Sequence, residues 1–299
     1  MLFNNKMVDQ ACFKAIKNEN VQIQKKRKEL PLRVEKQKVG SGSYNIVYNA
    51  VADKRCKENG KKFIFRRSKT AVESFKLFKQ EAKMAIKMSV AKAGPEIYNV
   101  GIDTKDRGFI VMEHYPHSLR QVVEFPPSRR PSWEEIEKGL RGPLNKMASE
   151  GVFCSDLKFR NVVLAKRSSG WVFKIIDFGE DFCAFESDLY LANNKAKKDF
   201  LPKNKEKMSK ILYCSMLIMM SINSERSRKK FFQNKKPLFS KELKEMPLDV
   251  KIPALLFINK GKSNTGMRTP IAQARHYYSK PLTNANKIYE ILTGETLKR

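Results

Sequence analysis

Two short polar stretches carry side chains that could act together on a phosphate group. The first holds Asp156 and Asn161, five positions apart, and the second is an Asp-Phe-Gly that begins at Asp177. Between them, apolar runs at 162–164 and 171–173 flank a polar turn that contains glycine, which predicts two strands joined as a hairpin. Phosphoryl transfer needs a carboxylate that accepts the proton of the attacking hydroxyl, and an amide oxygen and a second carboxylate that hold Mg²⁺. The spacing therefore indicates phosphoryl-transfer chemistry around this hairpin.

The same stretch resembles the catalytic and metal-binding core of eukaryotic-type protein kinases, whose signatures are H-R-D-L-x-x-x-N and D-F-G. The resemblance implies that Asp156 is the catalytic aspartate and that Asn161 and Asp177 hold the metal. It also implies a catalytic role for Lys158, because a lysine two places after the aspartate is typical of serine/threonine kinases and would neutralise the γ-phosphate. The implied cofactors are ATP and Mg²⁺, with Mn²⁺ as a substitute. The implied substrates are serine and threonine hydroxyls of proteins.

A glycine-containing segment upstream resembles the loop G-x-G-x-x-G-x-V that covers the nucleotide phosphates in this family. Gly40, Gly42 and Val47 match, and Asn45 stands at the third glycine. Asparagine tolerates left-handed backbone geometry better than most residues, so this departure is mild. An apolar strand at 46–51 follows the loop, which predicts a strand-loop-strand hairpin rather than the strand-loop-helix of a dinucleotide site. The resemblance assigns Gly40, Gly42 and Val47 to nucleotide binding.

The next predicted strand, residues 61–67, should present a basic side chain to the α- and β-phosphates. Alternation of apolar residues places Ile64 at the family's alanine and Arg66 at its lysine, on one face of the strand. Arginine keeps the positive charge, but its planar guanidinium is not interchangeable with lysine. Lys62 lies on the same face one pleat earlier and is the alternative. This departure affects the expected rate of turnover rather than the fold.

A helix is predicted over residues 74–90, because apolar residues recur there at three- and four-residue spacing among Lys and Glu. By resemblance, Glu81 on this helix pairs with the phosphate-contacting base of the strand. Glu73 is the competing assignment for the same role.

The segment from 111 to 119 resembles the family's hinge, which holds the adenine. Met112 would stand at the gatekeeper position, and the backbone of Glu113 and Tyr115 would meet the adenine ring. Because backbone groups do this work, the identity of these side chains carries little information about the nucleotide.

The resemblance implies an α+β fold of two lobes with ATP in the cleft between them. Residues 34–113 would form the N-terminal lobe, an antiparallel sheet with one helix. Residues 114–299 would form a mainly helical C-terminal lobe that is divergent and basic after about residue 190. Residues 1–33 would be a basic extension, in which the apolar residues predict one amphipathic helix.

Two helices of the C-terminal lobe are predicted from local patterns. Ser132 followed by Glu135 forms a capping box that would open one of them, and the apolar run 211–222 predicts a buried helix. Between them, Cys154 and Ser155 replace the family's His-Arg, and the A-P-E motif is absent. Without that arginine the chain lacks a basic residue to hold a phosphorylated activation loop. We therefore expect activity that does not depend on such phosphorylation.

The chain is strongly basic. Its 299 residues include 60 Lys and Arg against 31 Asp and Glu, a net charge of +29. A field of this sign attracts nucleic acid or acidic protein partners, and without a recognisable nucleic-acid-binding motif the expected association is non-specific. The longest apolar run is too short to span a membrane, and polar residues near the start interrupt any signal peptide. No membrane insertion is therefore predicted.

The five cysteines are scattered along the chain, and no C-x-x-C pair occurs. They stand at positions 12, 56, 154, 183 and 214. An odd number without close pairs predicts reduced thiols in a cytosolic compartment, with neither disulfides nor zinc. A nucleophilic Cys154 would need a histidine and an aspartate to orient it, and no such pair lies nearby in the sequence.

A compact kinase with a divergent C-terminal lobe and strong basic charge is most similar to the serine/threonine kinases of large cytoplasmic DNA viruses. That similarity implies action on viral or host proteins in the host cytoplasm, and presence in virions. Two alternatives stay open. One is a nucleotide-binding pseudokinase scaffold, indicated by Arg66 and the missing His-Arg, and the other is a basic, nucleic-acid-associated structural protein. The joint presence of Asp156, Asn161 and Asp177 favours the enzyme, because a scaffold has no chemical need for all three.

Overall fold

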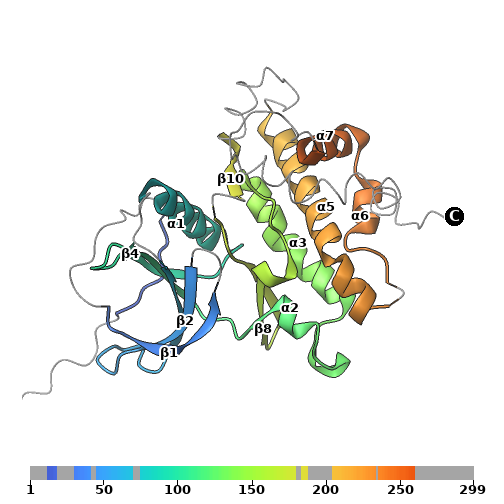
Figure 1. Ribbon diagram of the computed structural model, residues 1–299. Helices are drawn as coiled ribbons and strands as arrows, with labels where there is room; N and C mark the ends of the chain where they lie inside the picture. Colours follow the sequence, from blue (N-terminus) through green and yellow to red (C-terminus); the bar gives the residue numbers. More distant parts are fainter. Residues whose placement is uncertain are drawn as a thin grey trace, which may run out of the picture. The chain divides into compact units, whose positions relative to one another are not determined.

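The chain folds as an α+β protein with an antiparallel N-terminal sheet and a helical C-terminal region, as the sequence predicts (Figure 1). It divides into two units, Met1–His114 and Tyr115–Arg299. The computed structural model describes residues 12–18, 30–41, 45–69, 75–179, 183–187, 204–233 and 235–259.

In the part of the first unit that the structure describes, five antiparallel strands are accompanied by one helix. In sheet order these are β1 (Leu32–Ser41), β2 (Asn45–Ala52), β3 (Lys62–Ser68), β5 (Gly108–Glu113) and β4 (Ile97–Ile102), with the helix α1 (Phe75–Val90). The register pairs Val47 with Arg66, and Ile64 with Met112. Because directly paired residues share a face of a sheet, these four side chains lie on one face, the one on which the predicted nucleotide contacts fall.

The opposite face of this sheet carries the core of the first unit. Its buried side chains include Phe63, Phe65 and Val111, and Phe13 from the N-terminal segment joins them with 5% of its surface exposed. The Phe13 and Phe63 ring centroids are 4.8 Å apart, and the Ile16 N–H donates to the Ile97 carbonyl at 2.7 Å. The prediction of an amphipathic helix is wrong for residues 12–18, which form no helix. Apolar side chains of this segment, such as Phe13, pack individually against the sheet and do not form the apolar stripe of an amphipathic helix.

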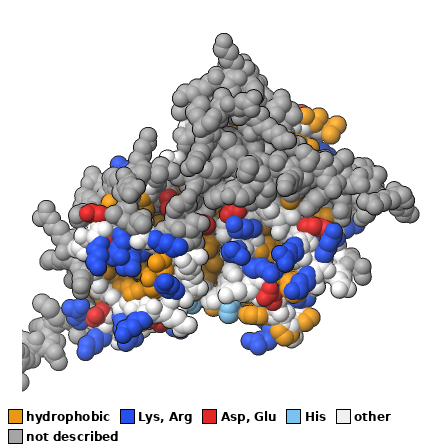
Figure 2. Space-filling model, in the orientation of Figure 1, with side chains coloured by type: hydrophobic (Ala, Val, Ile, Leu, Met, Phe, Trp, Pro, Cys, Tyr) orange, Lys and Arg blue, Asp and Glu red, His pale blue; other side chains and the backbone are white. Residues whose placement is uncertain are grey.

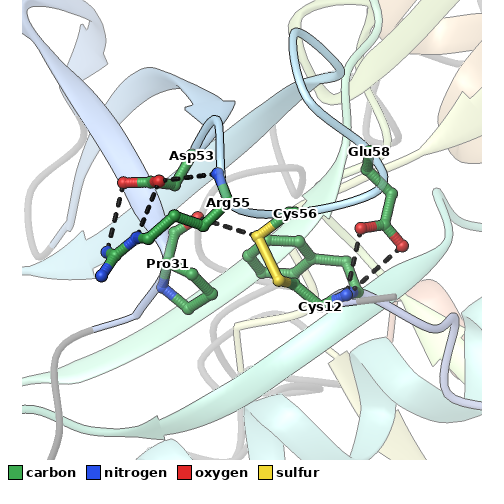
Figure 3. The surroundings of a disulfide bond; sticks show 7 residues. Cys12, Pro31, Asp53, Arg55, Cys56 and Glu58 are labelled. Carbon is green, nitrogen blue, oxygen red and sulfur yellow. Dashed lines mark hydrogen bonds and ion pairs between the residues drawn. A yellow bond between two sulfur atoms is a disulfide. The ribbon is translucent and has the colours of Figure 1, made fainter. Parts of the chain in front are cut away.

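A disulfide joins this segment to the turn after β2, so the prediction of reduced thiols is also wrong. Cys12 and Cys56 are bonded, with their Cα atoms 5.4 Å apart (Figure 3). The Glu58 carboxylate accepts the Cys12 N–H at 3.0 Å, on the same side of the bond. A second disulfide joins Cys154 to Cys183. The cysteines of the two pairs are 44 and 29 positions apart in the sequence. Spacing along the chain does not show which cysteines at such separations come into contact.

Among its described residues, the second unit combines helices with two small antiparallel sheets. One sheet has the order β6 (His117–Ser118), β8 (Val162–Arg167), β9 (Gly170–Ile175), and the other pairs β7 (Val152–Cys154) with β10 (Cys183–Phe185). The α-helices are α2 (Leu119–Val122), α3 (Trp133–Ser149), α5 (Lys205–Phe231), α6 (Ser240–Glu245) and α7 (Leu248–Asn259), and the 3₁₀ turns are η1 (Pro127–Arg129) and η2 (Phe159–Asn161).

Helix α3 is the support on which the hairpin β8–β9 is built. It begins at the predicted capping box: Ser132 Oγ accepts the Glu135 N–H at 3.1 Å, and the Glu135 carboxylate accepts the Ser132 N–H at 2.7 Å. It packs against β9 and α5. A Cβ on Gly139 would lie 2.2 Å from a ring carbon of Phe173, so glycine is what allows this strand to approach the helix.

Helix α5 contains the predicted buried run 211–222 and extends beyond it on both sides. It begins at Asn204, whose side chain accepts the Lys207 N–H at 3.0 Å, which satisfies one of the first backbone donors. Burial raises the pKa of the Cys214 thiol on this helix to about 12, so this cysteine stays protonated near neutral pH. Among the described residues, no helix has the length and apolarity needed to cross a bilayer.

Candidate active site

Three of the predicted catalytic and metal-binding side chains bond to one another just before β8. The Lys158 ammonium contacts both carboxylate oxygens of Asp156, at 2.8 and 2.6 Å. The Asn161 amide nitrogen donates to the backbone oxygen of Asp156 at 3.0 Å and to its carboxylate at 3.1 Å. The Asp156 side chain is 11% exposed and that of Lys158 is 38% exposed. The carboxylate is therefore held in a fixed orientation while the lysine that neutralises it keeps access to solvent.

The hairpin brings the fourth predicted residue to the same end. Asn161 precedes β8 and Asp177 follows β9, and the Ile176 N–H donates to the backbone oxygen of Asn161 at 2.9 Å, one step beyond the Val162–Ile175 pair. Asp177 is exposed and has a φ of 69°, in the left-handed region. Aspartate enters this region more readily than most residues. The chain thus turns sharply at Asp177, directly after the strand that sets its position.

Two contacts that the sequence pattern did not reveal support the loop from Asp156 to Asn161. Asn223 on α5 donates its amide to the Leu157 backbone oxygen at 2.7 Å. Phe159, which is buried, lies 6.1 Å from the Trp133 ring, centroid to centroid. Asn223 is 66 residues from Leu157 in the sequence and directly follows the predicted buried run 211–222, so no local pattern marked it.

The arrangement has the donor set that a hard divalent cation prefers. Asn161 uses its amide nitrogen on Asp156, so its amide oxygen is the atom that could ligate a cation. Asp177 adds an exposed carboxylate beside it in the hairpin. Mg²⁺ is bound by a few such oxygens together with water and phosphate. The residues therefore fit Mg²⁺.

In the first unit, the structure brings together the predicted base and its predicted acid. Arg66 on β3 and Glu81 on α1 form an ion pair in which each side chain is 13% exposed. The alternative base, Lys62, is exposed on the same strand face. The alternative acid, Glu73, lies outside the described residues. Arg66 with Glu81 is therefore the pair that the described structure supports.

The other predicted nucleotide contacts on the strands of the first unit follow the same sheet face, as far as the structure describes them. Gly40 pairs with Val47, which pairs with Arg66, and Ile64 and Met112 form the adjacent row. Gly42 lies outside the described residues.

The two predicted hinge residues differ in their surroundings. The Glu113 N–H donates to the Glu96 carbonyl at 2.8 Å, so this amide is used within the first unit. Glu113 pairs with Phe63, which turns its side chain to the face opposite Ile64. Tyr115 is buried and belongs to the second unit.

Comparison with known families accounts for the region in which these residues lie. Residues 33–187 match the model of the protein kinase domain, and they make up more than half of the 299 residues. The matched region includes every candidate residue named above except Asn223, which lies beyond its end. A comparison with curated proteins gave no match. On the strength of the family match, the chain belongs to the protein kinase domain family, whose members transfer phosphoryl groups.

Proposed function

We propose that this chain is an ATP- and Mg²⁺-dependent protein kinase that phosphorylates serine and threonine. When bound, Mg²⁺ would bridge and neutralise the phosphates of ATP, with Mn²⁺ as a substitute. Asn161 and Asp177 are the residues that would hold it. Asp156 would accept the proton of the substrate hydroxyl, and Lys158 would neutralise charge on the transferred phosphate.

The observation that carries the proposal is the bonding among Asp156, Lys158 and Asn161. Two hydrogen bonds from Asn161 fix the orientation of Asp156, and a fixed base is what proton transfer from a hydroxyl needs. Lys158 is partly exposed, so it can leave one carboxylate oxygen when a phosphate arrives. A lysine at this position also supports serine and threonine, rather than tyrosine, as acceptors.

Arg66 is proposed to position the α- and β-phosphates. Its guanidinium is oriented by Glu81, and it has more donors than a single carboxylate uses. Gly40, Gly42, Val47, Ile64 and Met112 would contact the nucleotide, together with the backbone of Glu113 and Tyr115.

The proposed setting is viral. The signature departures and the basic charge resemble the serine/threonine protein kinase of African swine fever virus, so we propose viral or host proteins as substrates, in the host cytoplasm or in virions. On the described part of the face drawn in Figure 2, Lys and Arg side chains outnumber the scattered acidic ones. With a net charge of +29, such a surface would attract acidic substrates or, non-specifically, nucleic acid.

The direct test is phosphate transfer from labelled ATP to histone, with Mg²⁺ or Mn²⁺. Wild type should label serine or threonine, while Asp156→Asn and Asp177→Asn should lose the activity. Asp249→Asn is the matched control, because Asp249 is an exposed carboxylate of α7 that pairs with Lys207. Label on tyrosine would contradict the specificity, and full activity in Asp156→Asn would contradict the assigned base.

A nucleotide-binding scaffold without catalysis is the second candidate, and Arg66 is the observation that favours it. Arginine cannot present the compact ammonium that the family pattern provides. Binding of ATP by wild type without transfer under any metal would establish the scaffold. Transfer that disappears in Asp156→Asn would exclude it.

A further inference from the structure

The disulfide Cys154–Cys183 lies within the two-stranded sheet β7–β10, which pairs the segment before Asp156 with the segment after Asp177. Cys154 in β7 lies directly opposite Cys183 in β10, and their Cα atoms are 4.1 Å apart. Both are almost completely buried, with 3% and 1% of their surface exposed. The bond is therefore part of the interior of the second unit rather than a surface crosslink.

The 29-residue span between these cysteines contains all four catalytic and metal-binding candidates. Cys154 stands two positions before Asp156. At the other end, the Cys183 N–H donates to the Gly179 carbonyl at 2.9 Å, and Cys183 Sγ lies 3.9 Å from the Asp177 carbonyl oxygen. Each sulfur thus belongs to a segment whose backbone position fixes one of the two aspartates.

The hairpin β8–β9 joins these two segments at the Asp177 end, through the Ile176–Asn161 hydrogen bond, and the pair β7–β10 joins them at the Cys183 end. Strands β7 and β10 have three residues each, and one flanking hydrogen bond, from the Glu186 N–H to the Gly151 carbonyl, measures 2.7 Å. A two-stranded pair of this length is marginal without further support. Opening the bond should therefore loosen the chain that follows Asp177 relative to the Asp156 loop, while the hairpin β8–β9 still holds the residues before Asp177.

We propose that Cys154 and Cys183 are a redox-controlled pair, and that phosphoryl transfer requires their disulfide. The inference rests on the proposed kinase function. The oxidant would be a low-molecular-weight disulfide such as oxidised glutathione. One protein sulfur attacks it to form a mixed disulfide and release one thiol, and the second protein sulfur displaces the other. Two thiols lose two electrons and two protons, which convert the oxidant into two thiols.

The other disulfide supplies an internal control. Cys12 is exposed whereas both sulfurs of the Cys154–Cys183 pair are buried, and thiol–disulfide exchange needs access to a sulfur. We therefore expect a reductant to open Cys12–Cys56 first, and Cys154–Cys183 only when β7 and β10 separate. Loss of activity should follow the slower of the two events.

The experiment is a redox titration of the full chain in mixtures of reduced and oxidised glutathione. Alkylation of free thiols followed by peptide mass analysis gives the closed fraction of each pair, and transfer to histone gives the rate. We expect the rate to follow the closed fraction of Cys154–Cys183, to fall at least tenfold when it opens, and to recover on reoxidation. The variant with both Cys12→Ser and Cys56→Ser should respond in the same way.

Four outcomes would overturn the inference. These are a rate that is unchanged when Cys154–Cys183 is open, a rate that follows only Cys12–Cys56, a pair that never oxidises, and Cys183→Ser with the full wild-type rate. Cys183→Ser should instead transfer slowly and equally at every glutathione ratio. Absence of transfer in every redox state, with the disulfide detected, would overturn the kinase proposal together with the switch. Transfer that ignores the redox state overturns the switch alone.

Discussion

In the second unit Asp156, Lys158 and Asn161 bond to one another within six residues of chain, whereas in the first unit Arg66 and Glu81 meet from a strand and a helix. Each residue of the first group orients another, so replacing one disturbs the rest. In the first unit the sheet register and one ion pair set the positions. Among the residues compared, the departure from the family pattern is Arg66, in the first unit, whereas the second unit departs at Cys154 and Ser155, just before the bonded group. Residue identity is thus kept within the group whose side chains orient one another.

Breaking the second unit's group should have the largest effect. Asn161→Ala removes both hydrogen bonds to Asp156 and a proposed metal oxygen at once. We expect kcat to fall by roughly 10²–10³-fold and the Mg²⁺ requirement to rise at least tenfold, because ligands and the groups that orient them are each worth about 10–100-fold. Steady-state kinetics over a Mg²⁺ titration measures both.

Asn99→Ala is the matched control for this change. It replaces a half-buried asparagine of β4 in the first unit, away from the proposed metal residues, and should leave the Mg²⁺ dependence unaltered. Equal Mg²⁺ curves for Asn161→Ala and wild type would refute the metal role of Asn161.

The ion pair of the first unit should give the next largest effect. Arg66→Ala removes a charged donor, worth about 1.5–3 kcal/mol, so we expect kcat/KM for ATP to fall about 10- to 100-fold. It also leaves Glu81 largely buried without its partner, which should lower stability by about 3 kcal/mol. Thermal unfolding and steady-state kinetics with ATP, measured for Arg66→Ala, Glu81→Gln and the double variant, form a double-mutant cycle that gives the coupling between the two residues.

If the sheet register sets the position of residue 66, Arg66→Lys should retain most of the activity, because the lysine side chain would leave β3 on the same face. An Arg66→Ala variant as active as wild type would remove Arg66 from the phosphate contacts. An effect on stability alone, with kinetics unchanged, would leave it only a structural partner of Glu81.

A smaller effect is expected where the loop is held from α5. Asn223→Ala removes the hydrogen bond to the Leu157 carbonyl, a contribution of about 0.5–1.5 kcal/mol, so kcat should fall about two- to tenfold. KM for ATP should not change, because Asn223 contacts the loop and none of the proposed nucleotide residues. A rise in KM without loss of kcat would contradict this positioning role.

The smallest effect concerns the N-terminal segment of the first unit. A hydrogen bond from the Tyr98 hydroxyl, above all, and contact with Lys17 hold the pKa of Glu96 below its usual range. A lowered folded pKa gives stability that is present above the ordinary glutamate pKa of about 4.3 and is lost as the pH falls through the folded value. The pair with Lys17 is largely exposed, so its share is about 0.5 kcal/mol or less.

Amide exchange of Ile16, whose N–H bonds to Ile97, reports the opening of this segment. After correction for the intrinsic rate, protection should be lower in Glu96→Gln than in wild type near neutral pH, and the difference should vanish in acid. Glu124→Gln, which breaks the exposed Arg120 pair of the second unit, should leave Ile16 unaffected. A difference in Ile16 protection that grows as the pH falls would contradict a lowered pKa of Glu96 in the folded protein.

The parts of the fold that local patterns specify were predictable. The hairpin β8–β9, the capping box of α3 and the run 211–222 each follow from residues close together in sequence. The pairing of Arg66 with Glu81 was implied by the family resemblance, and strand alternation placed Arg66 on the expected face.

The parts that failed depend on contacts between distant residues. Both disulfides, the docking of Phe13 and the support from Asn223 join residues 29 or more positions apart. The odd number of cysteines and the absence of a C-x-x-C pair argued for free thiols, yet four of the five are paired. Each of these contacts forms only when the chain folds in three dimensions, and local sequence periodicity does not specify it.

The place of Phe13 in the core also sets the order in which a growing chain can complete its first unit. Its neighbours in that core include Phe63, Tyr98 and Val111, so the residues that leave the ribosome early have partners that emerge much later. At about 5–20 residues per second, the segment waits roughly 5–20 s with an apolar side chain unburied. The first-made part of this unit is therefore the last to find its place, and a chaperone that shields the early segment should raise the yield of folded protein.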